Sequence, residues 1–421
     1  MHRFRSPMRR ARTLRRRMPA RPRKADGTKM HGTLDGPGHW SRRLDAIMRR
    51  RASVLLLLGL LSPPSSAGQA GNCSANQTLH WRGGSLRLEN DLFAGTDRNY
   101  TNGASIVLVS RDLEGPLAPD CLPFAVGMFA AFIARANPDF WQAGGTEGPV
   151  QNVVLRFGQS MYTPTDKART DLIVEERPYA GLLSMSLAWN RRWRAPGRRV
   201  EILDTRELTL GVIGPWSLAE QTQNLVHDLR GIERFHGWDN QLHNEPAFQL
   251  AWERKIRPLA SGAVRPGLGS DVIGSGALRI GNIETAASLG VEARVGWNLP
   301  NDFGSYPIRP GAENRPPSAL TQGRDGVTQE AGGPRPGAHA FVSLEAKAVA
   351  WDFSLDGNLL RDSHRVQRRP FVAQAAAGIS SQWQVAGHGL RLAVMRVWRT
   401  QEFRGQSGSH AFGSVAASLE F

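Results

Sequence analysis

The sequence predicts an all-β fold: a transmembrane antiparallel β-barrel of about twelve strands, with one short helix in an extracellular loop. Three observations carry this prediction: an export signal, no later apolar run long enough for a spanning helix, and many segments in which apolar residues alternate with small or polar ones. Outer-membrane strands alternate in this way because one face meets lipid and the other meets a polar lumen. A soluble β-sandwich gives a similar pattern, and the export signal together with the terminal aromatic Phe421 favours the barrel.

The charge of the chain is concentrated at its start. The 421 residues carry a formal net charge of +16, which alone would suggest a nucleic-acid partner. Residues 1–51 hold 17 Lys and Arg against three Asp, a local net of +14, which leaves +2 for all the others. The rest of the chain therefore has no basic excess, and nucleic-acid binding is disfavoured.

A signal peptide follows this basic segment. Arg49–Arg51 precede the apolar run Ala52–Leu61, and small residues follow up to Ala70, with cleavage expected after Ala67 or Ala70. The run is too short to span a bilayer, which takes about 20 residues. We therefore divide the chain into a disordered basic extension (1–47), which a misplaced start codon would explain, a signal peptide (48–70) and an outer-membrane barrel domain (71–421). A real basic arm is the alternative for the extension.

Twelve segments with period-two alternation are the predicted strands. In one of them Leu183, Met185 and Leu187 alternate with Ser184 and Ser186, and the last segment ends on Phe421. An even number of strands returns both chain ends to the periplasm, where the inserts 112–149 and 300–337 are unusually long for periplasmic turns. The predicted strands are 83–92, 100–111, 150–162, 180–193, 199–213, 245–257, 262–280, 284–298, 338–352, 369–383, 388–402 and 409–421.

Two stretches carry most of the polar residues suited to chemistry. Glu89–Gly103 is dense in Asn, Asp and Thr where one predicted strand turns into the next. The same residue types also form ordinary turns, so a plain turn is the alternative. Further on, Ser217 and Glu220 form a capping box and Gly231 supplies a stop, which predicts a helix over 218–230.

The predicted helix places two polar side chains on one face. Gln223 and His227 are four residues apart, and a face of Gln and His turned back toward the Asn/Asp/Thr stretch gives a reason for a helix among the loops. His236 and His243 are interpreted as loop or rim residues. A lone His is often only structural; here we favour a functional role.

Other loop residues are weaker candidates. Lys167 and Arg169 lie on a predicted extracellular loop, where cations could meet the phosphates of lipopolysaccharide, or they are ordinary loop charges. Arg177 and Tyr179 open the next strand and are candidates for substrate contact or for bracing the rim.

The sequence has two cysteines, Cys73 and Cys121, and an exported chain favours a disulfide between them. Two cysteines alone cannot close a zinc site.

Several motifs occur in a fixed order along the chain. They are E-N-D-L-F with T-D-R-N-Y-T-N-G, then Q-S-M-Y-T-P, E-R-P-Y-A-G, Q-N-L-V-H with G-W-D-N-Q-L, and W-D-F-S-L-D-G-N. Through these motifs the chain resembles the outer-membrane lipid A 3′-O-deacylase family. The likeness runs from about residue 84 to the end, so it covers nearly the whole predicted mature chain.

This resemblance implies a calcium-dependent esterase that removes the 3′-O-linked acyl or acyloxyacyl chain of lipid A in the outer leaflet. The implied catalytic positions are Asn90, Asp91, Thr101, Gln223, His227 and Glu233. His227 is expected to activate water, because an imidazole accepts a proton near neutral pH. Asp91 and Thr101 are expected to hold Ca²⁺, a hard cation that prefers oxygen ligands. Gln223 and Glu233 are expected either to orient the base or to complete the ligand shell.

The sequence departs from the family pattern at two points. Phe235 stands where an enzyme of the family can carry tyrosine, and the loop after Tyr162 lacks a dense Lys/Arg run. In addition, Asn90 and Asp91 would point to opposite faces of a regular strand, so both can serve one site only if the strand ends or bulges there.

Two other functions stay open from the sequence. The first is a non-enzymatic barrel, either a pore or a structural protein; the second is an outer-membrane phospholipase. A phospholipase of this kind uses a serine held by a histidine, and no serine is placed beside His227 in the sequence. A pore gives no reason for the capped helix.

Overall fold

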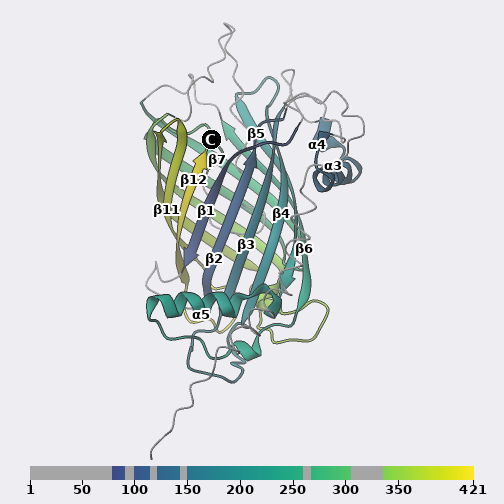
Figure 1. Cartoon of the computed structure of the whole chain (residues 1–421), viewed down its shortest axis with the longest axis vertical. Coiled ribbons are helices and arrows are strands. Elements are labelled where there is room, and N and C mark those ends of the chain that lie inside the picture. The colour runs from purple at the N-terminus through teal and green to yellow at the C-terminus, as the bar shows by residue number, and fades with distance from the viewer. Residues whose placement is uncertain (1–77, 91–98, 114–120, 143–148, 259–266, 305–334) are drawn as a thin grey trace, which may run out of the picture. The chain divides into compact units, whose positions relative to one another are not determined.

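The chain forms a closed antiparallel barrel of twelve strands in sequence order, with β1 paired to β12 (Figure 1). This computed structural model describes residues 78–90, 99–113, 121–142, 149–258, 267–304 and 335–421, with the backbone alone for 99–102. The predicted extension, the predicted signal peptide and Cys73 lie outside these residues. We call the end where β1 starts and β12 ends the periplasmic end, following the predicted orientation, and the opposite end the extracellular end.

The predicted strands correspond one to one to those of the structure. Most boundaries agree within about two residues; the predicted start of the seventh strand at 262 lies outside the described residues. The strands are β1 (Trp81–Asn90), β2 (Asn99–Ser110), β3 (Val150–Thr163), β4 (Ala180–Arg194), β5 (Val200–Ile213), β6 (Glu245–Pro258), β7 (Leu268–Gly281), β8 (Glu284–Trp297), β9 (Gly337–Asp352), β10 (Phe371–Val385), β11 (His388–Arg399) and β12 (His410–Glu420).

The alternation in the sequence becomes an apolar outer face and a charged lumen. On β6, Phe248 is 48% exposed on the outer face, whereas Glu253 and Lys255 are buried inside. Among the described residues, no helix has both the length and the hydropathy that crossing a membrane requires.

Residues 301–304, which follow β8, fold into the lumen at its periplasmic end. The carboxylate of Asp302 accepts hydrogen bonds from Arg294 of β8 and from Arg391 of β11, the latter at 2.5 Å. The carbonyl of Asp302 accepts from Arg257 of β6 at 2.9 Å. Strands β8 and β11 are therefore linked through one carboxylate inside the barrel.

The neighbouring Phe303 completes this closure. It is 1% exposed, and the guanidinium groups of Arg192 and Arg257 each lie 5.3 Å from its ring centroid. Both guanidinium groups also donate to Glu201, at 2.6 and 2.5 Å. Described side chains thus occupy the lumen at this level, which a wide aqueous pore would leave open.

The helix predicted in the loop between β5 and β6 is present as α5 (Ala219–Arg230). Its stop is confirmed, because Gly231 adopts φ 63° and the amide of Ile232 donates to the carbonyl of His227 at 2.9 Å. The predicted capping box is wrong. Leu218 is the N-cap, in a left-handed conformation, because Ser217 is drawn into a preceding 3₁₀ turn, η4 (Pro215–Ser217).

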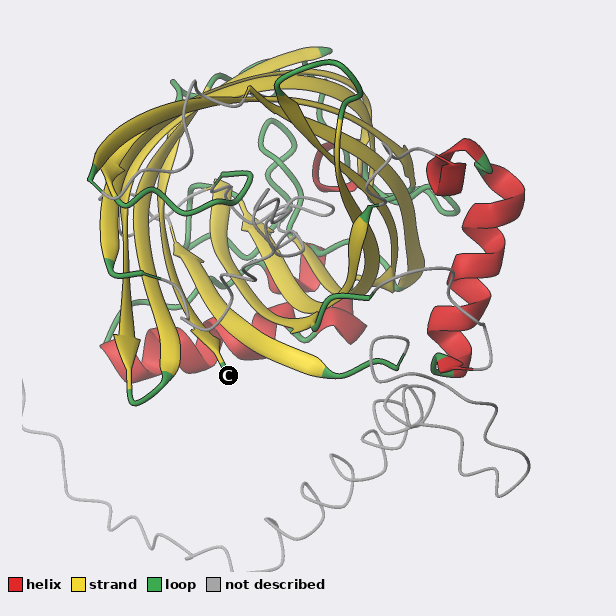
Figure 2. Ribbon diagram, turned by 90° about the horizontal axis from the view of Figure 1, so that it is seen from above, coloured by secondary structure: helices red, strands yellow, loops and turns green. Residues whose placement is uncertain are grey.

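The structure has more helices than the single one predicted. Further helices are α3 (Phe124–Ala136) and α4 (Asp139–Gln142), which lie in the long insert between β2 and β3, and α6 (Phe353–Asp356) between β9 and β10. Short 3₁₀ turns also occur, including η5 (Trp238–Asn240). The apolar run that forms α3 lies in the insert 112–149, for which the sequence predicts no helix. Figure 2 shows α3 and α4 outside the barrel wall.

A glycine allows α5 to lie against the outer face of the wall. On β4 the even-numbered Arg192 points into the lumen, so the odd-numbered Gly181 faces outward. A Cβ at Gly181 would come 2.1 Å from Ser217 Oγ and 2.4 Å from Ala219 Cβ. Figure 1 shows α5 crossing the extracellular ends of β1, β2 and β3. The helix therefore packs directly on the backbone of β4 at its first turn.

We predict that Gly181→Ala displaces the start of α5 while the barrel still forms. Backbone and helix cannot both stay in place with an atom 2.1 Å from Ser217 Oγ. Limited trypsin digestion should then cut faster at Arg230, at the other end of α5, with the heat-modifiable gel shift of a folded barrel retained. Gly158→Ala is the matched control on β3, where the nearest neighbour is 3.6 Å away. Equal cleavage in both variants would contradict this packing.

We also predict that Asp302→Ala destabilises the barrel by about 3 kcal/mol, because it removes a buried carboxylate that two guanidinium groups share. Urea unfolding of the detergent-solubilised protein, followed by tryptophan fluorescence, measures this change. Asp171→Ala removes a carboxylate from an exposed ion pair with Arg169 and should leave the midpoint unchanged. Similar midpoints for both variants would show that the lumen network contributes little.

Candidate functional site

The candidate site is the face of α5 that packs on the wall. Gln223 and His227 are 1% and 2% exposed, so the predicted shared face is confirmed as the buried one. Next to it lies a cluster of buried side chains from the wall and from the loops on either side of it. The cluster consists of Met161, Tyr179, Ala219, Phe235 and Trp238.

The geometry around His227 fixes which ring nitrogen can act as a base. His227 Nδ1 lies 2.6 Å from the carbonyl oxygen of Glu233. A carbonyl only accepts, so Nδ1 carries the proton, and the lone pair of the neutral ring is on Nε2. Glu233 therefore contributes its backbone to the site, while its side chain is exposed. Of the two roles expected for Glu233, only the contact of its backbone carbonyl with the imidazole is seen in the described residues.

Gln223 is held by a residue to which the sequence assigned no role. Trp238 Nε1 donates to Gln223 Oε1 at 2.7 Å. An indole N–H can only donate, so the amide oxygen must face Trp238 and the amide NH₂ must face away from it. Among the described residues, Gln223 Nε2 has no hydrogen-bond partner although it is buried. The site therefore has a fixed donor ready for an oxygen atom.

Phe235 links the histidine to the neighbouring loop. Its ring lies 5.8 Å from the His227 ring and 6.3 Å from that of Tyr179, and Lys167 Nζ lies 5.3 Å from its centroid. A Cβ at Gly237 would come 2.6 Å from the Tyr179 ring, so this loop packs closely. Burial raises the pKa of Tyr179 to about 12, so its phenol stays protonated. Phe235 serves as a packing surface, which needs no hydroxyl.

The Asn/Asp/Thr stretch reaches the same end of the wall. Strand β1 ends at Asn90, which shares the outer face with Leu86 and Leu88 yet is only 9% exposed. Asn90 pairs with Asn102 across the β1–β2 hairpin, and the register of β2 against β3 shifts at Thr101. Asp91 and the Thr101 side chain lie outside the described part of the structure.

The four predicted substrate contacts occupy different surroundings. Lys167 is partly exposed beside the site, whereas Arg169 forms an exposed pair with Asp171, with Nε donating to Oδ1 at 3.0 Å. Tyr179 packs within the site. Arg177 is 1% exposed and its guanidinium lies 4.8 Å from the centroid of Tyr162. Only Lys167 combines exposure with proximity to His227.

Arg177 braces the rim of the barrel. It donates to Ser354 Oγ at 3.0 Å and lies 3.5 Å from Glu402, which joins three extracellular loops. Burial would raise the pKa of Glu402, but the guanidinium groups of Arg399 and Arg177 lower it to about 2. The carboxylate therefore stays charged, and Arg177 stays engaged by it.

No three His, Cys, Asp or Glu side chains of the described residues lie close enough to hold a metal ion. Calcium does not need such a group, because amide, hydroxyl and carbonyl oxygens also serve. Asn90 and the backbone of Thr101 lie at the same end of the β1–β2 hairpin. Asp91 follows Asn90 in the sequence. The chemistry of this donor set fits calcium.

Only one of the two cysteines of the predicted disulfide belongs to the described residues. Cys121 is disulfide-bonded, and its predicted partner Cys73 lies outside the described residues.

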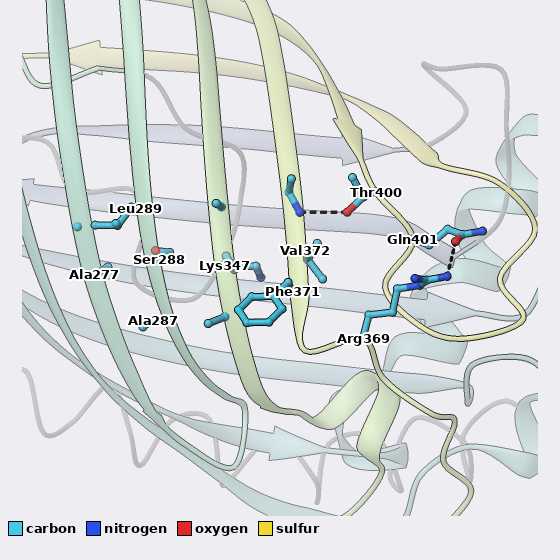
Figure 3. A pocket seen from close by; sticks show the side chains of 14 residues that line it. Ala277, Ala287, Ser288, Leu289, Lys347, Arg369, Phe371, Val372, Thr400 and Gln401 are labelled. Atoms are coloured by element: carbon cyan, nitrogen blue, oxygen red, sulfur yellow. Dashed lines mark hydrogen bonds between the residues drawn. The ribbon is translucent and has the colours of Figure 1, made fainter.

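A separate hollow of about 820 Å³ lies across β7–β10 (Figure 3). Its exposed lining residues Leu289, Ala348 and Phe371 belong to the outer face, so the hollow opens toward the membrane. At its edge Arg369 Nη2 donates to Gln401 Oε1 at 2.7 Å. None of its lining residues belongs to α5 or to the β1–β2 hairpin, so it is separate from the candidate site.

The chain is similar to one named protein family and to solved barrels. The model of the family described as outer membrane protein LpxR matches residues 54–421. LpxR from Salmonella typhimurium is similar in structure, with a TM-score of 0.55 and 16% identity over 80% of this chain and 100% of that chain. The translocator domain of the autotransporter NalP from Neisseria meningitidis reaches a TM-score of only 0.31, at 11% identity over 90% of this chain and 98% of that chain.

No curated protein matches the sequence. At 16% identity the LpxR structure supports the fold alone, and the family match is what extends over most of the chain. The predicted family, barrel and membrane are thereby confirmed: the chain belongs to the LpxR family of integral outer-membrane β-barrel proteins.

Proposed function

We propose that this protein is a calcium-dependent esterase that removes the 3′-O-linked acyl or acyloxyacyl chain of lipid A. The observation that carries the proposal is the pairing on α5 of a histidine whose Nδ1 is held by a carbonyl with a glutamine whose NH₂ has no partner among the described residues. The first can take a proton, and the second can donate to an oxygen. Ester hydrolysis by water needs both functions.

In the proposed reaction His227 Nε2 takes a proton from a water molecule, and the resulting hydroxide attacks the ester carbonyl carbon. The carbonyl of Glu233 accepts a hydrogen bond from Nδ1, so the ring keeps its orientation. The same carbonyl stabilises the imidazolium that forms. Negative charge then develops on the carbonyl oxygen, where the NH₂ of Gln223 would donate. The imidazolium returns the proton to the sugar oxygen as the acyl–oxygen bond breaks, giving a free carboxylic acid.

Calcium is proposed to act together with the NH₂ of Gln223 on the ester carbonyl. Asn90, Asp91 and Thr101 would hold it at the extracellular end of the β1–β2 hairpin. When bound, the ion would supply positive charge that polarises the ester carbonyl.

The position of α5 supports a membrane lipid as the substrate. The helix and the turn before it expose apolar side chains at the extracellular end, among them Trp216, Leu225 and Leu229, which are 63%, 58% and 79% exposed. A lipid in the outer leaflet could therefore approach with its acyl chains along the wall. Lys167, beside Phe235, is the cation placed to meet a phosphate of lipid A.

The two alternatives have less support. A wide pore conflicts with the Asp302 and Phe303 closure of the lumen. A serine esterase needs a serine beside the base, and Ser217 lies at the opposite end of α5. From Ala219 to His227 the helix rises by about 12 Å, which is too far for a hydrogen bond.

We predict that the purified protein removes one 3′-acyl or acyloxyacyl mass from lipid A only when calcium is present, and that His227→Ala abolishes the reaction. Mass spectrometry of lipid A, with calcium or with a chelator, measures both. His236→Ala is the matched control, since His236 is exposed and outside the packed face. Release of fatty acid from phospholipid instead, or full activity of His227→Ala, would contradict the proposal.

A second prediction separates the two roles left open for Gln223. If its NH₂ donates to the developing oxyanion, Gln223→Glu should lower kcat by about 10²-fold or more, because the variant replaces a donor with an acceptor. If Gln223 were instead a calcium ligand, the carboxylate should preserve activity and lower the calcium concentration needed. Trp238→Phe, which frees the amide oxygen, should lower kcat by a smaller factor, about tenfold. Steady-state kinetics across a calcium titration distinguishes these outcomes.

A further inference from the structure

Helix α3 lies outside the barrel and exposes apolar side chains on the face turned away from it. Val126, Phe129 and Ile133 are buried against the wall. On the other side Phe124 and Met128 are 66% and 57% exposed. A helix that is apolar on all sides is typical of a protein core or a membrane, so this exposed face needs a partner.

The side chains beneath α3 belong to the outer face of the wall. Trp189 of β4 is fully buried in one cluster with Phe129 and Phe140, and Leu208 of β5 packs on the same cluster. Trp189 is on the outer face because it is odd-numbered, like Gly181 on the same strand. Further along β5, Leu210 is 46% exposed on this face. The surface of α3 is therefore continuous with the lipid-facing surface of the barrel.

Charged groups on the outer wall place α3 at the level of lipid headgroups. Asp204 accepts from Arg254 through both oxygens, at 2.7 and 2.9 Å, although both residues face outward. Arg206, also outward, donates to Asn137 just after α3 at 2.7 and 2.9 Å and lies 4.6 Å from the centroid of Phe140. Outward charges are costly in the centre of a bilayer and are tolerated near its interface.

Basic residues accompany the helix at the same end. The only charged residue of α3 is the exposed Arg135, and the turn between β4 and β5 exposes Arg198 and Arg199. Cations beside an exposed apolar stripe are the pattern of a helix that lies in a membrane interface with anionic lipids. Three half-exposed side chains offer roughly 300 Å², below the 800 Å² or so that a stable dimer buries on each partner.

We propose that α3 is an interfacial membrane helix, whose Phe124, Met128 and Phe132 side chains insert among the acyl chains of phospholipids in the periplasmic leaflet. The helix would anchor that end of the barrel wall and set its depth in the bilayer. This role is independent of the esterase site, which lies at the extracellular end.

The test is a depth measurement on the whole protein refolded into vesicles of phosphatidylethanolamine and phosphatidylglycerol. A nitroxide label on Met128→Cys is exposed to oxygen, which concentrates in hydrocarbon, and to a water-soluble nickel complex. We expect oxygen collisions to dominate at Met128→Cys and at the lipid-facing Leu210→Cys, and nickel collisions to dominate at Arg198→Cys in the periplasmic turn. Phe132→Cys gives an independent second reading, and a heat-modifiable gel shift verifies folding of each variant.

Two results would overturn the proposal. One is dominance of nickel collisions at both Met128→Cys and Phe132→Cys in folded protein, which would place the helix in water. The other is dipolar broadening between labels that disappears on dilution with unlabelled protein, which would assign the apolar face to a second copy of the chain.

Discussion

The close approach of α5 to the barrel wall is the constraint on which the site depends. A glycine at position 181 leaves room for the first turn of the helix, and the loop after the helix returns over Tyr179 with Gly237 against its ring. Between these two points the Gln223 and His227 face of the helix is buried against the outer wall. The proposed chemistry is therefore positioned by packing on the outside of the barrel.

The lumen has a separate role as a stabilising core. Charges are paired across it, with the Asp302 carboxylate accepting from Arg294 and Arg391, and the guanidinium groups of Arg192 and Arg257 lie 5.3 Å from the Phe303 ring centroid. Such pairs contribute when both partners are present and become costly when one is lost. Filling of the lumen at its periplasmic end by described side chains agrees with a proposed substrate that is bound on the outer surface, a membrane lipid.

Much of this arrangement could be predicted from the sequence. Period-two alternation located the twelve strands, and the four-residue spacing of Gln223 and His227 identified the buried face of α5. The N-terminal cap could not be predicted, because Ser217 is committed to a turn against Gly181 and Leu218 takes the left-handed position. The sequence also could not show that the backbone carbonyl of Glu233 contacts His227 Nδ1, since every residue has a carbonyl.

The loop cations were equally ambiguous for a physical reason. Sequence places Arg177 in a loop but does not tell whether its side chain faces solvent or the rim, and the structure turns it inward to Ser354 and Glu402. Likewise an apolar run such as that of α3 has the same composition whether it covers a core or a membrane. In both cases the deciding information is which surface the folded chain leaves beside the segment.

The central claim is that lipid A is bound on the outer wall beside α5. The most direct measurement is photo-cross-linking of lipid A to the inactive His227→Ala protein, with a photoreactive phenylalanine in place of Leu88, two residues before Asn90. The same residue in place of Ile280, exposed on the outer face at the same end of β7, reports contact with bulk lipid. We expect saturable labelling at Leu88 at lipid A concentrations that leave Ile280 unlabelled; equal labelling at both positions would contradict the account.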